Sequence, residues 1–328
     1  MATKNGNLHK AKSAKNDEFY TQLTDIEKEM QYYKDFFKGK VVYCNCDDPR
    51  ESNFFLYFSE CFESLGLKKL ITTGYKANGK GVIYIYEGDK NGNRIVDNNE
   101  VEVIELQGNG DFRSEECINY LKQADVVVTN PPFSLFREYV AQLMEYGKKF
   151  IILSNNNAIT YKEFFPYIKN GQIWLGRTLF TGKMPFFKVP DNYPLENERF
   201  EKREDGLYKQ VNSICWFTNV PNDNKREILD AYKKYNATDY PKYDNYDAIE
   251  CARMEYLPKD FNGVIGIPIT GLKYLWSDGT IHADIDGKTT QFEILGIDRY
   301  IENNPNYGHR FTIDGKEIYA RLLIKILA

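Results

Sequence analysis

The sequence predicts an α/β fold in which a parallel sheet carries helices on both faces. Up to about residue 220, short runs rich in Val, Ile and aromatic residues alternate with segments whose apolar residues recur at helical spacing. Parallel neighbouring strands need a crossover between them, and the helical segments can supply it. Loops of unusual composition follow three of the runs. Because ligands bind beyond the carboxyl ends of the strands in such sheets, we expect a binding site along that edge.

The predicted elements follow one another from residue 26 onward. Apolar spacing predicts a helix over residues 26–37, with Thr24 or Asp25 as its N-cap. The next helix is capped by Ser52 and stopped by Gly66. The strands are expected, in order, in KVVYCNC, KKLITTGY, VEVIELQ, DVVVT, KKFIILS, QIWLG and SICWFTNV, and the other helices in SEECINYLKQA, LFREYVAQLMEYG and TYKEFFPYIKN.

Two regions depart from this alternation. Residues 76–100 contain an Asn-Gly turn between two β-rich runs, which predicts a hairpin inserted at the sheet's edge, before VEVIELQ resumes as a core strand. After about residue 220 the alternation fades, and FEILGIDRY and IYARLLIKIL can each be strands or strand–helix hybrids. We expect an N-terminal arm over residues 1–16, a principal domain over residues 17–220 and a smaller domain over residues 221–328.

The composition argues against several classes of protein. No stretch approaches the roughly 18 consecutive apolar residues of a membrane span, and the N-terminus lacks the apolar segment of a signal peptide. The six cysteines form no CxxC pair and the three histidines are dispersed, so we expect free buried thiols and no metal site. A cytoplasmic protein without membrane association is predicted. The net charge of −4 argues mildly against nucleic-acid binding through bulk charge, but four early lysines form a basic arm that is either a solvated tail or a phosphate contact.

The most informative motif is Asn130-Pro131-Pro132-Phe133, directly after an apolar run. The exocyclic amine of a nucleobase is a poor nucleophile because its lone pair is delocalised into the ring. The side-chain carbonyl of Asn130 and the backbone carbonyl of Pro131 can accept the two N–H hydrogens and favour a more tetrahedral nitrogen. The prolines stiffen the turn, and Phe133 offers a face on which a base can stack. The alternative is a helix-initiating turn in which Asn is the cap; the strand before it and the aromatic residue favour the catalytic interpretation.

On these residues the chain resembles the EcoRI-type adenine-specific DNA methyltransferases. DVVVTNPPF is similar to the catalytic motif of amino-methyltransferases that use S-adenosylmethionine. The likeness to the EcoRI type covers most of the chain, in the motifs DEFYTQ, KVVYCNCDDPR, LGLKKLI, GDFRS, VVTNPPFSLF, ITYKE, IWLG and YPKYDNYDAI. The resemblance implies a class I (Rossmann-like) methyltransferase sheet flanked by helices in a catalytic, S-adenosylmethionine-binding domain. It also implies that the smaller C-terminal domain recognises the target.

The reaction implied by the resemblance is methyl transfer from S-adenosylmethionine to the N6 amine of an adenine flipped out of duplex DNA, without a metal. Asn130, Pro131 and Phe133 would hold the adenine, and Pro132 would stiffen the turn. For the methyl donor, the family's pattern implies contacts from Phe19, Tyr20 and Thr21 near the methionine part, from Asp111 to the adenine amine and from Phe112 to the adenine ring. The alternatives for these residues are an aromatic staple and an ordinary Asp near a helix N-terminus.

The sequence departs from the common methyltransferase pattern in two loops. The loop after the first predicted strand lacks the usual glycines and offers Asp47 and Asp48, one of which would contact the donor's ammonium group or ribose. A carboxylate at the end of the second strand, the usual ribose ligand, is absent, and LITTGY provides only hydroxyl groups there.

The resemblance places target recognition after about residue 220. Candidates for DNA contacts are Arg177, Lys183, Lys188 and the Tyr-rich segment 240–246, although a solvated surface is the simpler role for each. We expect a monomer inside a bacterial cell that modifies duplex DNA, either alone or as the counterpart of a restriction endonuclease without a stable complex. The same chemistry leaves RNA, cytosine N4 and protein glutamine open as acceptors, and a non-catalytic DNA-binding module is a further alternative.

Overall fold

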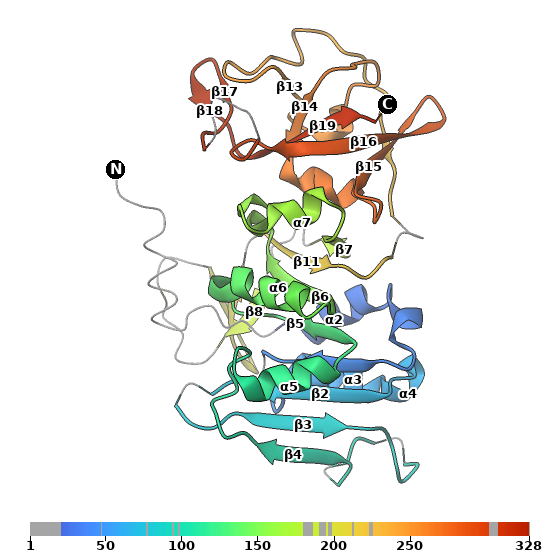
Figure 1. Cartoon of the computed structure of the whole chain (residues 1–328), viewed down its shortest axis with the longest axis vertical. Helices are drawn as coiled ribbons and strands as arrows, with labels where there is room; N and C mark the ends of the chain where they lie inside the picture. Colours follow the sequence, from blue (N-terminus) through green and yellow to red (C-terminus); the bar gives the residue numbers. More distant parts are fainter. Residues whose placement is uncertain are drawn as a thin grey trace. The chain divides into compact units, whose positions relative to one another are not determined.

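Figure 1 shows the computed structural model of the chain, which describes residues 21–46, 48–76, 78–93, 95–97, 99–179, 186–189, 195, 199–211, 213–222, 226–301 and 308–327. The chain divides into two compact units. Unit 1 consists of Met1–Asn156 and Thr178–Val220, and unit 2 consists of Asn157–Arg177 and Pro221–Ala328. Residues 157–177, which the sequence analysis assigns to the principal domain, therefore cluster with the C-terminal part of the chain.

A mixed sheet of eight strands lies at the centre of unit 1, in the order β4-β3-β2-β1-β5-β6-β11-β7. The parallel core agrees with the sequence analysis, because β2, β1, β5 and β6 run parallel to one another. Strand β3 runs antiparallel to β2 and β4, and β11 runs antiparallel to β6, while the boundary between the units falls within β7. The strands are β1 (Val41–Cys44), β2 (Lys69–Gly74), β3 (Val82–Tyr86), β4 (Val101–Glu105), β5 (Val126–Thr129), β6 (Lys149–Asn155), β7 (Trp174–Leu179) and β11 (Ile214–Thr218).

The run VEVIELQ is not the core strand that the sequence analysis expects. It forms β4, which pairs antiparallel with β3 at the edge of the sheet, and Val103 is 57% exposed. Exposed side chains lie on both faces of β4, Glu102 on one and Val103 and Glu105 on the other, so β4 is an edge strand and not a core strand. A hairpin does lie at this edge, but not within residues 76–100 as predicted: its arms are β3 and β4, and Asn91-Gly92 lies in the long connection between them.

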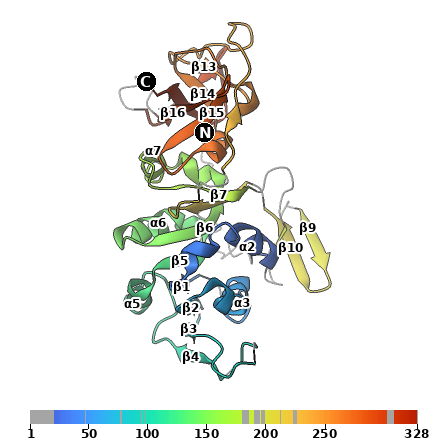
Figure 2. The ribbon, with the colours of Figure 1, turned by 90° about the vertical axis from the view of Figure 1, so that its right-hand side faces the viewer.

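Helices cover both faces of the sheet, as Figure 2 shows. One face packs against α2 (Leu23–Met30), α3 (Asn53–Glu60) and α4 (Phe62–Leu65), and the other against α5 (Glu115–Gln123) and α6 (Phe136–Glu145). Ser52 caps α3 and Gly66 ends α4 in a left-handed conformation, which confirms both predictions. The predicted cap of the first helix is wrong: α2 has Gln22 at its N-cap without a side-chain bond, and it ends at Met30 before the short 3-10 helix η1 (Lys34–Phe37).

A small antiparallel sheet completes unit 1 and was not predicted. Its order is β8-β10-β9, with β8 (Phe186–Val189), β9 (Phe200–Arg203) and β10 (Gly206–Gln210). Phe187 and Val189 on one face of this sheet are buried in the main core cluster, and Leu207 packs against that cluster. The sheet therefore adds to the same core as the parallel strands.

Unit 2 is built on a six-stranded sheet in the order β12-β15-β16-β19-β14-β13. The two runs that the sequence left open between strand and hybrid are both strands, β16 and β19. The strands are β12 (Leu229–Asp230), β13 (Ile249–Glu250), β14 (Ile265–Pro268), β15 (Thr280–Ile285), β16 (Lys288–Ile297) and β19 (Arg321–Ile326), with a separate hairpin of β17 (Thr312–Ile313) and β18 (Lys316–Glu317). The helical elements are η3 (Asn156–Thr160), α7 (Phe165–Lys169), η5 (Met254–Tyr256) and η6 (Ile269–Tyr274).

All six cysteines are free thiols. Four of them are buried, as the sequence analysis expects, whereas Cys46 and Cys61 are partly exposed. Within the described residues, no helix is both long and apolar enough to cross a membrane. The same part of the chain contains no cluster of His, Cys, Asp and Glu side chains arranged to hold a metal ion.

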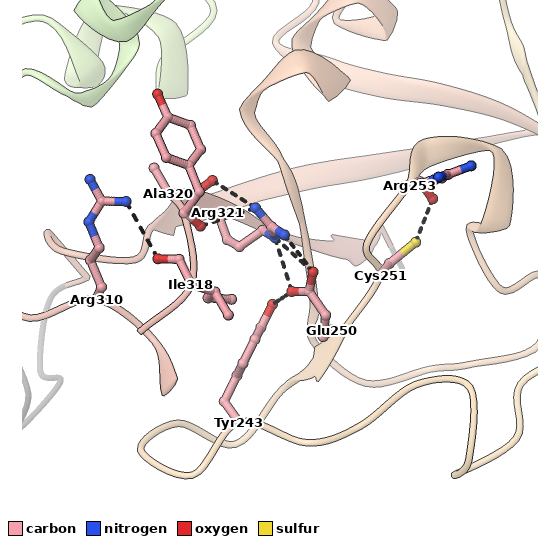
Figure 3. A network of polar contacts seen from close by, with 9 residues as sticks. Tyr243, Glu250, Cys251, Arg253, Arg310, Ile318, Ala320 and Arg321 are labelled. Carbon is pink, nitrogen blue, oxygen red and sulfur yellow. Dashed lines mark hydrogen bonds and ion pairs between the residues drawn. The ribbon is translucent and has the colours of Figure 1, made fainter. Parts of the chain in front are cut away.

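A buried ion pair joins two strands of unit 2. The guanidinium group of Arg321 on β19 binds both carboxylate oxygens of Glu250 on β13, at 2.7 to 3.0 Å, and Tyr243 donates its hydroxyl hydrogen to the same carboxylate (Figure 3). The two charged side chains are only 13% and 7% exposed. Each charge therefore depends on its partner in place of water.

Substitution Arg321→Met should lower the free energy of unfolding by about 3–5 kcal/mol, because it leaves the Glu250 carboxylate buried without its counter-charge. Denaturant unfolding measures the loss. The matched control is Lys80→Met, which removes the exposed ion pair with Glu105, whose side chains are 50% and 69% exposed. That change should stay within about 0.5 kcal/mol of the unsubstituted protein. Equal losses in the two variants would contradict the structural role given to the buried pair.

Candidate active site

The Asn-Pro-Pro-Phe turn lies at the carboxyl end of β5, inside the parallel core. Asn130 is 7% exposed and Pro131 is buried, whereas Pro132 and Phe133 are partly exposed. The Pro132 carbonyl accepts a hydrogen bond from the Leu135 amide at 3.0 Å and starts the 3-10 helix η2 (Phe133–Leu135), which leads into α6. The caps of η2 and α6 are Pro132 and Leu135, and neither cap uses a side chain. Asn130 is therefore not a helix cap, and the helix-initiating alternative is wrong.

The backbone of this turn carries a second acceptor, because the Pro131 carbonyl directly follows Asn130 in the chain. Strand β5 holds the turn firmly, because its four residues are fully buried and pair with β1 on one side and β6 on the other. The turn is thus a rigid element at the sheet's edge, with one side-chain carbonyl and one backbone carbonyl close together in sequence.

The loop after β1 reaches the same edge. Cys44 pairs with Thr72 of β2, so the two strands end side by side. Asp48 binds Arg50 through both of its carboxylate oxygens. Burial alone would raise the pKa of Asp48, but the hydrogen bonds and charge of Arg50, with a smaller contribution from Lys76, lower it below its usual value. Asp48 is therefore ionised at neutral pH, and Asp47 lies outside the described residues.

The loop after β4 carries the second predicted carboxylate. Asp111 accepts hydrogen bonds from the Arg113 guanidinium at 2.9 and 2.6 Å, and these bonds hold the pKa of Asp111 below its usual value. Phe112 is buried, with the guanidinium of Arg113 5.3 Å from its ring centre. The loop therefore presents an ionised, partly exposed carboxylate beside a buried ring.

A close approach of backbones joins the Asp48 turn and the Asp111 loop. Gly74 ends β2 between them: a Cβ atom there would lie 2.8 Å from Pro49 Cδ and 3.3 Å from Asp48 Cα. Gly110 has φ +81°, and a Cβ atom on it would collide with the Gly74 carbonyl. The amide of Lys76 also donates to the Asn109 carbonyl at 2.8 Å. Both predicted donor loops are thus brought to one place by glycines that the sequence analysis did not single out.

Helix α6 connects the Asp111 loop to the Asn-Pro-Pro-Phe turn that precedes it. The ring of Tyr139 meets Phe112 edge to face, with centroids 5.0 Å apart. Glu138 binds Arg113 at 3.0 Å, and Gln142 donates to the Phe112 carbonyl at 3.2 Å. These three residues follow the spacing of one helical face, which is the sequence signal that could have identified them.

The end of β1 contributes a further residue that the sequence analysis missed. Asn45 is buried, and its side-chain oxygen accepts hydrogen bonds from the Tyr139 hydroxyl and, at 3.7 Å, from the Cys46 thiol. Burial is the main reason that the pKa of Tyr139 is raised, so the phenol stays protonated and remains a donor. Tyr139 therefore connects the end of β1, the Asp111 loop and the helix that follows the Asn-Pro-Pro-Phe turn.

The N-terminal motif is only partly described. Phe19 and Tyr20 lie outside the described residues. Thr21 is buried, and its backbone carbonyl accepts a hydrogen bond from the Asn53 side chain at 2.7 Å, at the start of α3. This bond fixes the end of the motif against unit 1.

The candidates for DNA contact are dispersed. Lys188 lies on β8 of unit 1 and pairs with Asp205 at 3.7 Å, and Arg177 belongs to unit 2. Lys183 lies outside the described residues. In the segment 240–246, the side chains of Tyr240 and Tyr243 are buried and bonded within unit 2, so these two tyrosines are core residues that cannot read bases.

Comparison with known proteins gives one consistent result. Residues 7–326 match the family described as "Adenine-specific methyltransferase EcoRI". The chain is 45% identical to the Type II methyltransferase M.EcoRI of Escherichia coli, over 97% of this chain and 95% of that protein. It is 36% identical to the Type II methyltransferase M.MpnI of Mycoplasma pneumoniae, over 97% of each chain. It is also 36% identical to the Type II methyltransferase M.MgeORF184P of Mycoplasma genitalium, over 97% of this chain and 98% of that protein. No solved structure gives a significant match.

Substitution Gly110→Ala should destabilise unit 1 and weaken S-adenosylmethionine binding at least tenfold, because the new methyl group would push the Asp111 loop away from β2. Thermal unfolding and calorimetric titration with S-adenosylmethionine measure the two effects. Gly108→Ala in the same loop is the control, since a Cβ atom there meets no atom within 4 Å. Donor affinity that is equal in both variants would show that the close approach at Gly74 does not shape the donor site.

Proposed function

The chain belongs to the adenine-specific methyltransferase EcoRI family, and from this membership we propose that it transfers a methyl group from S-adenosylmethionine to the N6 amine of an adenine in duplex DNA. The base would be flipped out of the helix, since an amine inside a duplex cannot reach a turn at a sheet edge. The observation that carries the proposal is the Asn130–Pro131 turn, which is buried at the end of the parallel core and caps no helix.

The proposed role of the turn is to hold and orient the amine. The side-chain carbonyl of Asn130 and the backbone carbonyl of Pro131 would each accept one N–H hydrogen. Their preorganisation matters because a fixed dipole that favours the reacting geometry costs no rearrangement during the reaction. Phe133, which is partly exposed, would stack on the base, and Pro132 would keep the turn stiff. The methylated amine releases its extra proton readily to water, so no dedicated base is required.

The residues around Gly74 suit a ligand that combines positive charge with a nucleoside, as the methyl donor S-adenosylmethionine does. Asp48 and Asp111 are both ionised and partly exposed, and the contacts of Gly74 bring their loops together. A carboxylate suits the ammonium group, ribose hydroxyls and adenine amine of S-adenosylmethionine, which supplies the methyl group when it is bound. We assign Asp111 and Phe112 to the adenine of the donor. Asp47 or Asp48 would contact the donor's amino acid part or its ribose. The methionine part would lie near Phe19, Tyr20 and Thr21. Arg113 would keep Asp111 charged and oriented.

The strand order supports a class I, Rossmann-like assignment. The parallel strands β1 and β5 carry the Asp48 turn and the Asn-Pro-Pro-Phe turn at their carboxyl ends, and the strand order reverses between these two neighbouring strands. Such a switch point is where ligands bind in doubly wound sheets. The antiparallel β11 next to β6 distinguishes this sheet from a purely parallel one.

The family favours adenine over the other planar amines that the turn can accommodate, namely cytosine N4, protein glutamine and RNA bases. We propose further that residues 221–328 recognise the target, that residues 1–16 contact phosphates, and that the protein acts as a monomer in the cell interior. The relatives named above are Type II methyltransferases, so we propose a modification enzyme that protects DNA from a restriction endonuclease without forming a stable complex with it.

Incubation of the full chain with labelled S-adenosylmethionine and duplex DNA should give N6-methyladenine, identified by mass spectrometry of the hydrolysed nucleosides. RNA and protein acceptors tested in parallel should remain unlabelled. Label in N4-methylcytosine, or in an acceptor other than DNA, would replace the proposed substrate; label in no acceptor would refute the activity.

Substitution Asn130→Ala should lower the turnover number by about 10²–10³-fold, the usual consequence of losing one preorganised polar group in a transition state. Binding of S-adenosylmethionine and the melting temperature should change little, because the donor residues lie on other loops. The control is Asn119→Ala on the exposed side of α5, which should keep full activity. A fully active Asn130→Ala enzyme would remove Asn130 from the mechanism.

A further inference from the structure

The small sheet β8-β10-β9 leaves the core of unit 1 at the edge that carries the Asn-Pro-Pro-Phe turn. Only residues 211–213 separate β10 from β11, and Ile214, the first residue of β11, pairs with Asn155 at the carboxyl end of β6. Strand β6 is the direct neighbour of β5, which ends at the turn. Because neighbouring strands are spaced by about 4.8 Å, the start of β11 lies about 10 Å to the side of the end of β5. A duplex that presents an adenine to the turn therefore passes close to the small sheet.

The small sheet and the Asn-Pro-Pro-Phe turn are attached to one core. Ser213, between β10 and β11, has a left-handed backbone with φ 60°, and its carbonyl accepts a hydrogen bond from the Asn156 amide at 2.6 Å. Phe200 of β9 and Phe133 of the turn pack against the same core cluster. The three strands project from this core as a separate layer, as Figure 2 shows for β9 and β10. A ligand that contacts both the turn and the small sheet is therefore held in a defined position.

The outer face of the small sheet carries an arginine stacked on a tyrosine. Since Phe187 and Val189 are buried in the core, the alternation along β8 turns Lys188 to the outer face, where it lies opposite Tyr208 of β10. The guanidinium carbon of Arg203 on β9 lies over Tyr208, 4.0 Å from its ring centre, and Tyr208 is only 4% exposed. Guanidinium groups favour such stacking on aromatic faces. The cation is thereby fixed against the sheet.

Arg203 keeps hydrogen-bond donors for a ligand. Its Nε and Nη2 donate to the two carboxylate oxygens of Glu201 at 3.2 and 3.3 Å. No hydrogen bond to another described residue uses its Nη1, and the side chain is 38% exposed. A guanidinium group has five N–H donors, and phosphate oxygens are favoured acceptors for those that carry no other partner. Arg203 is therefore a preoriented cation at the surface of unit 1.

Positive charge predominates on the small sheet. Its residues within 186–189 and 199–211 carry five cations and three carboxylates, a net charge of +2, whereas the whole chain has a net charge of −4. Arg199 and Lys202 are exposed and form no ion pair with another described residue. The cations are Lys188, Arg199, Lys202, Arg203 and Lys209, and the carboxylates are Glu201, Glu204 and Asp205.

Three of these cations lie along the free edge of the small sheet and form what we call the β9 surface: Arg199, Lys202 and Arg203. Strand β9 is an outer strand of its sheet, and Glu201, Lys202 and Arg203 are all exposed. At about 3.3 Å per residue the β9 surface is about 13 Å long, which matches about four nucleotides of one DNA strand at 3.4 Å each. The spacing therefore suits several successive phosphates.

We propose that the β9 surface binds the phosphate backbone of the target strand next to the flipped adenine. Arg203 donates to one phosphate, and Arg199 and Lys202 contact its neighbours. Extruding a base costs pairing and stacking energy, and contacts to the backbone beside that base offset this cost. An acidic protein partner would also suit the cations, but the position of the small sheet beside the turn favours the substrate's own backbone. The inference rests on the proposed DNA methyltransferase function.

The first test is the salt dependence of DNA binding by the full chain, measured by fluorescence anisotropy with a labelled duplex. Arg203→Gln should weaken binding by about tenfold, as expected for losing one hydrogen bond to a charged group. Both Arg203→Gln and Lys202→Gln should reduce the steepness of log K against log salt by about 0.9, the value for one phosphate contact. The loss should be equal on duplexes of different sequence, because phosphates carry no sequence information.

The matched controls are Lys90→Gln and Lys68→Gln, at the opposite end of the main sheet. Lys68 directly precedes β2, and Lys90 follows β3, which runs antiparallel to β2. Lys90 forms an exposed ion pair, as Arg203 does, and Lys68 is exposed without an ion pair to another described residue, as Lys202 is. Both controls should keep the affinity and the salt dependence of the unsubstituted protein. Melting temperatures verify the fold of each variant, and the exposed Lys202 decides the question if Arg203→Gln does not fold.

The second test locates the phosphate. In a set of duplexes, a single uncharged methylphosphonate linkage replaces each phosphate around the target adenine in turn, after sequencing of methylated DNA has mapped that adenine. One linkage close to the adenine should weaken binding of the unsubstituted protein but leave the binding of Arg203→Gln unchanged, since that variant has already lost the contact.

Three results would overturn the proposal while leaving the methyltransferase function intact. They are an unchanged salt dependence in the folded variants, an equal change in the controls, and a loss of affinity that is confined to one base sequence. Unchanged DNA binding would assign the β9 surface to a partner other than the substrate. An unsubstituted protein that neither binds nor methylates any duplex would overturn both the function and the role of the β9 surface.

Discussion

The contact between Gly74 and Gly110 is the constraint on which the candidate donor site depends. Side chains normally keep neighbouring backbones apart, whereas here the end of β2 touches the Asp48–Pro49 turn on one side and the Asp111 loop on the other. Many methyltransferases place glycines in the loop after the first strand, and this chain has none there. The close approach is made instead from β2 and from the loop after β4. The glycines that allow the backbones to approach closely therefore lie at the end of β2 and in the loop after β4, not in the loop after the first strand.

The Asn-Pro-Pro-Phe turn is positioned by a second set of contacts, all from α6. Because Glu138, Tyr139 and Gln142 each bind the loop of Phe112 and Arg113, the helix that begins after the catalytic turn is anchored to the donor loop. Tyr139 also binds Asn45 at the end of β1. A displacement of the donor loop would therefore be transmitted to the start of α6. Methyl transfer needs the amine and the methyl group aligned within a few tenths of an ångström, and shared anchoring is a direct way to keep them so.

The parallel core could be predicted from the sequence because it depends on local patterns, namely apolar runs and helical spacing. The sequence analysis misplaced β4. Alternating Val and Glu residues indicate a strand, but they do not show which strand pairs with it. The sequence could not show the roles of Gly74, Asn45 and Tyr139, because each depends on a partner distant in the chain. Asn45 and Tyr139 are 94 residues apart, and no spacing rule connects them.

The two buried acids of unit 2 depend on the same strand. Glu250 is saturated by Arg321 and Tyr243, so its charge is balanced without water. Asp298 accepts a hydrogen bond from the Arg299 amide, and its own amide donates to the Arg321 carbonyl. Arg321 thus holds Glu250 through its side chain and the backbone of Asp298 through its carbonyl. Because a buried charge that loses its partner is strongly destabilising, the first residue of β19 is a point on which the packing of unit 2 depends.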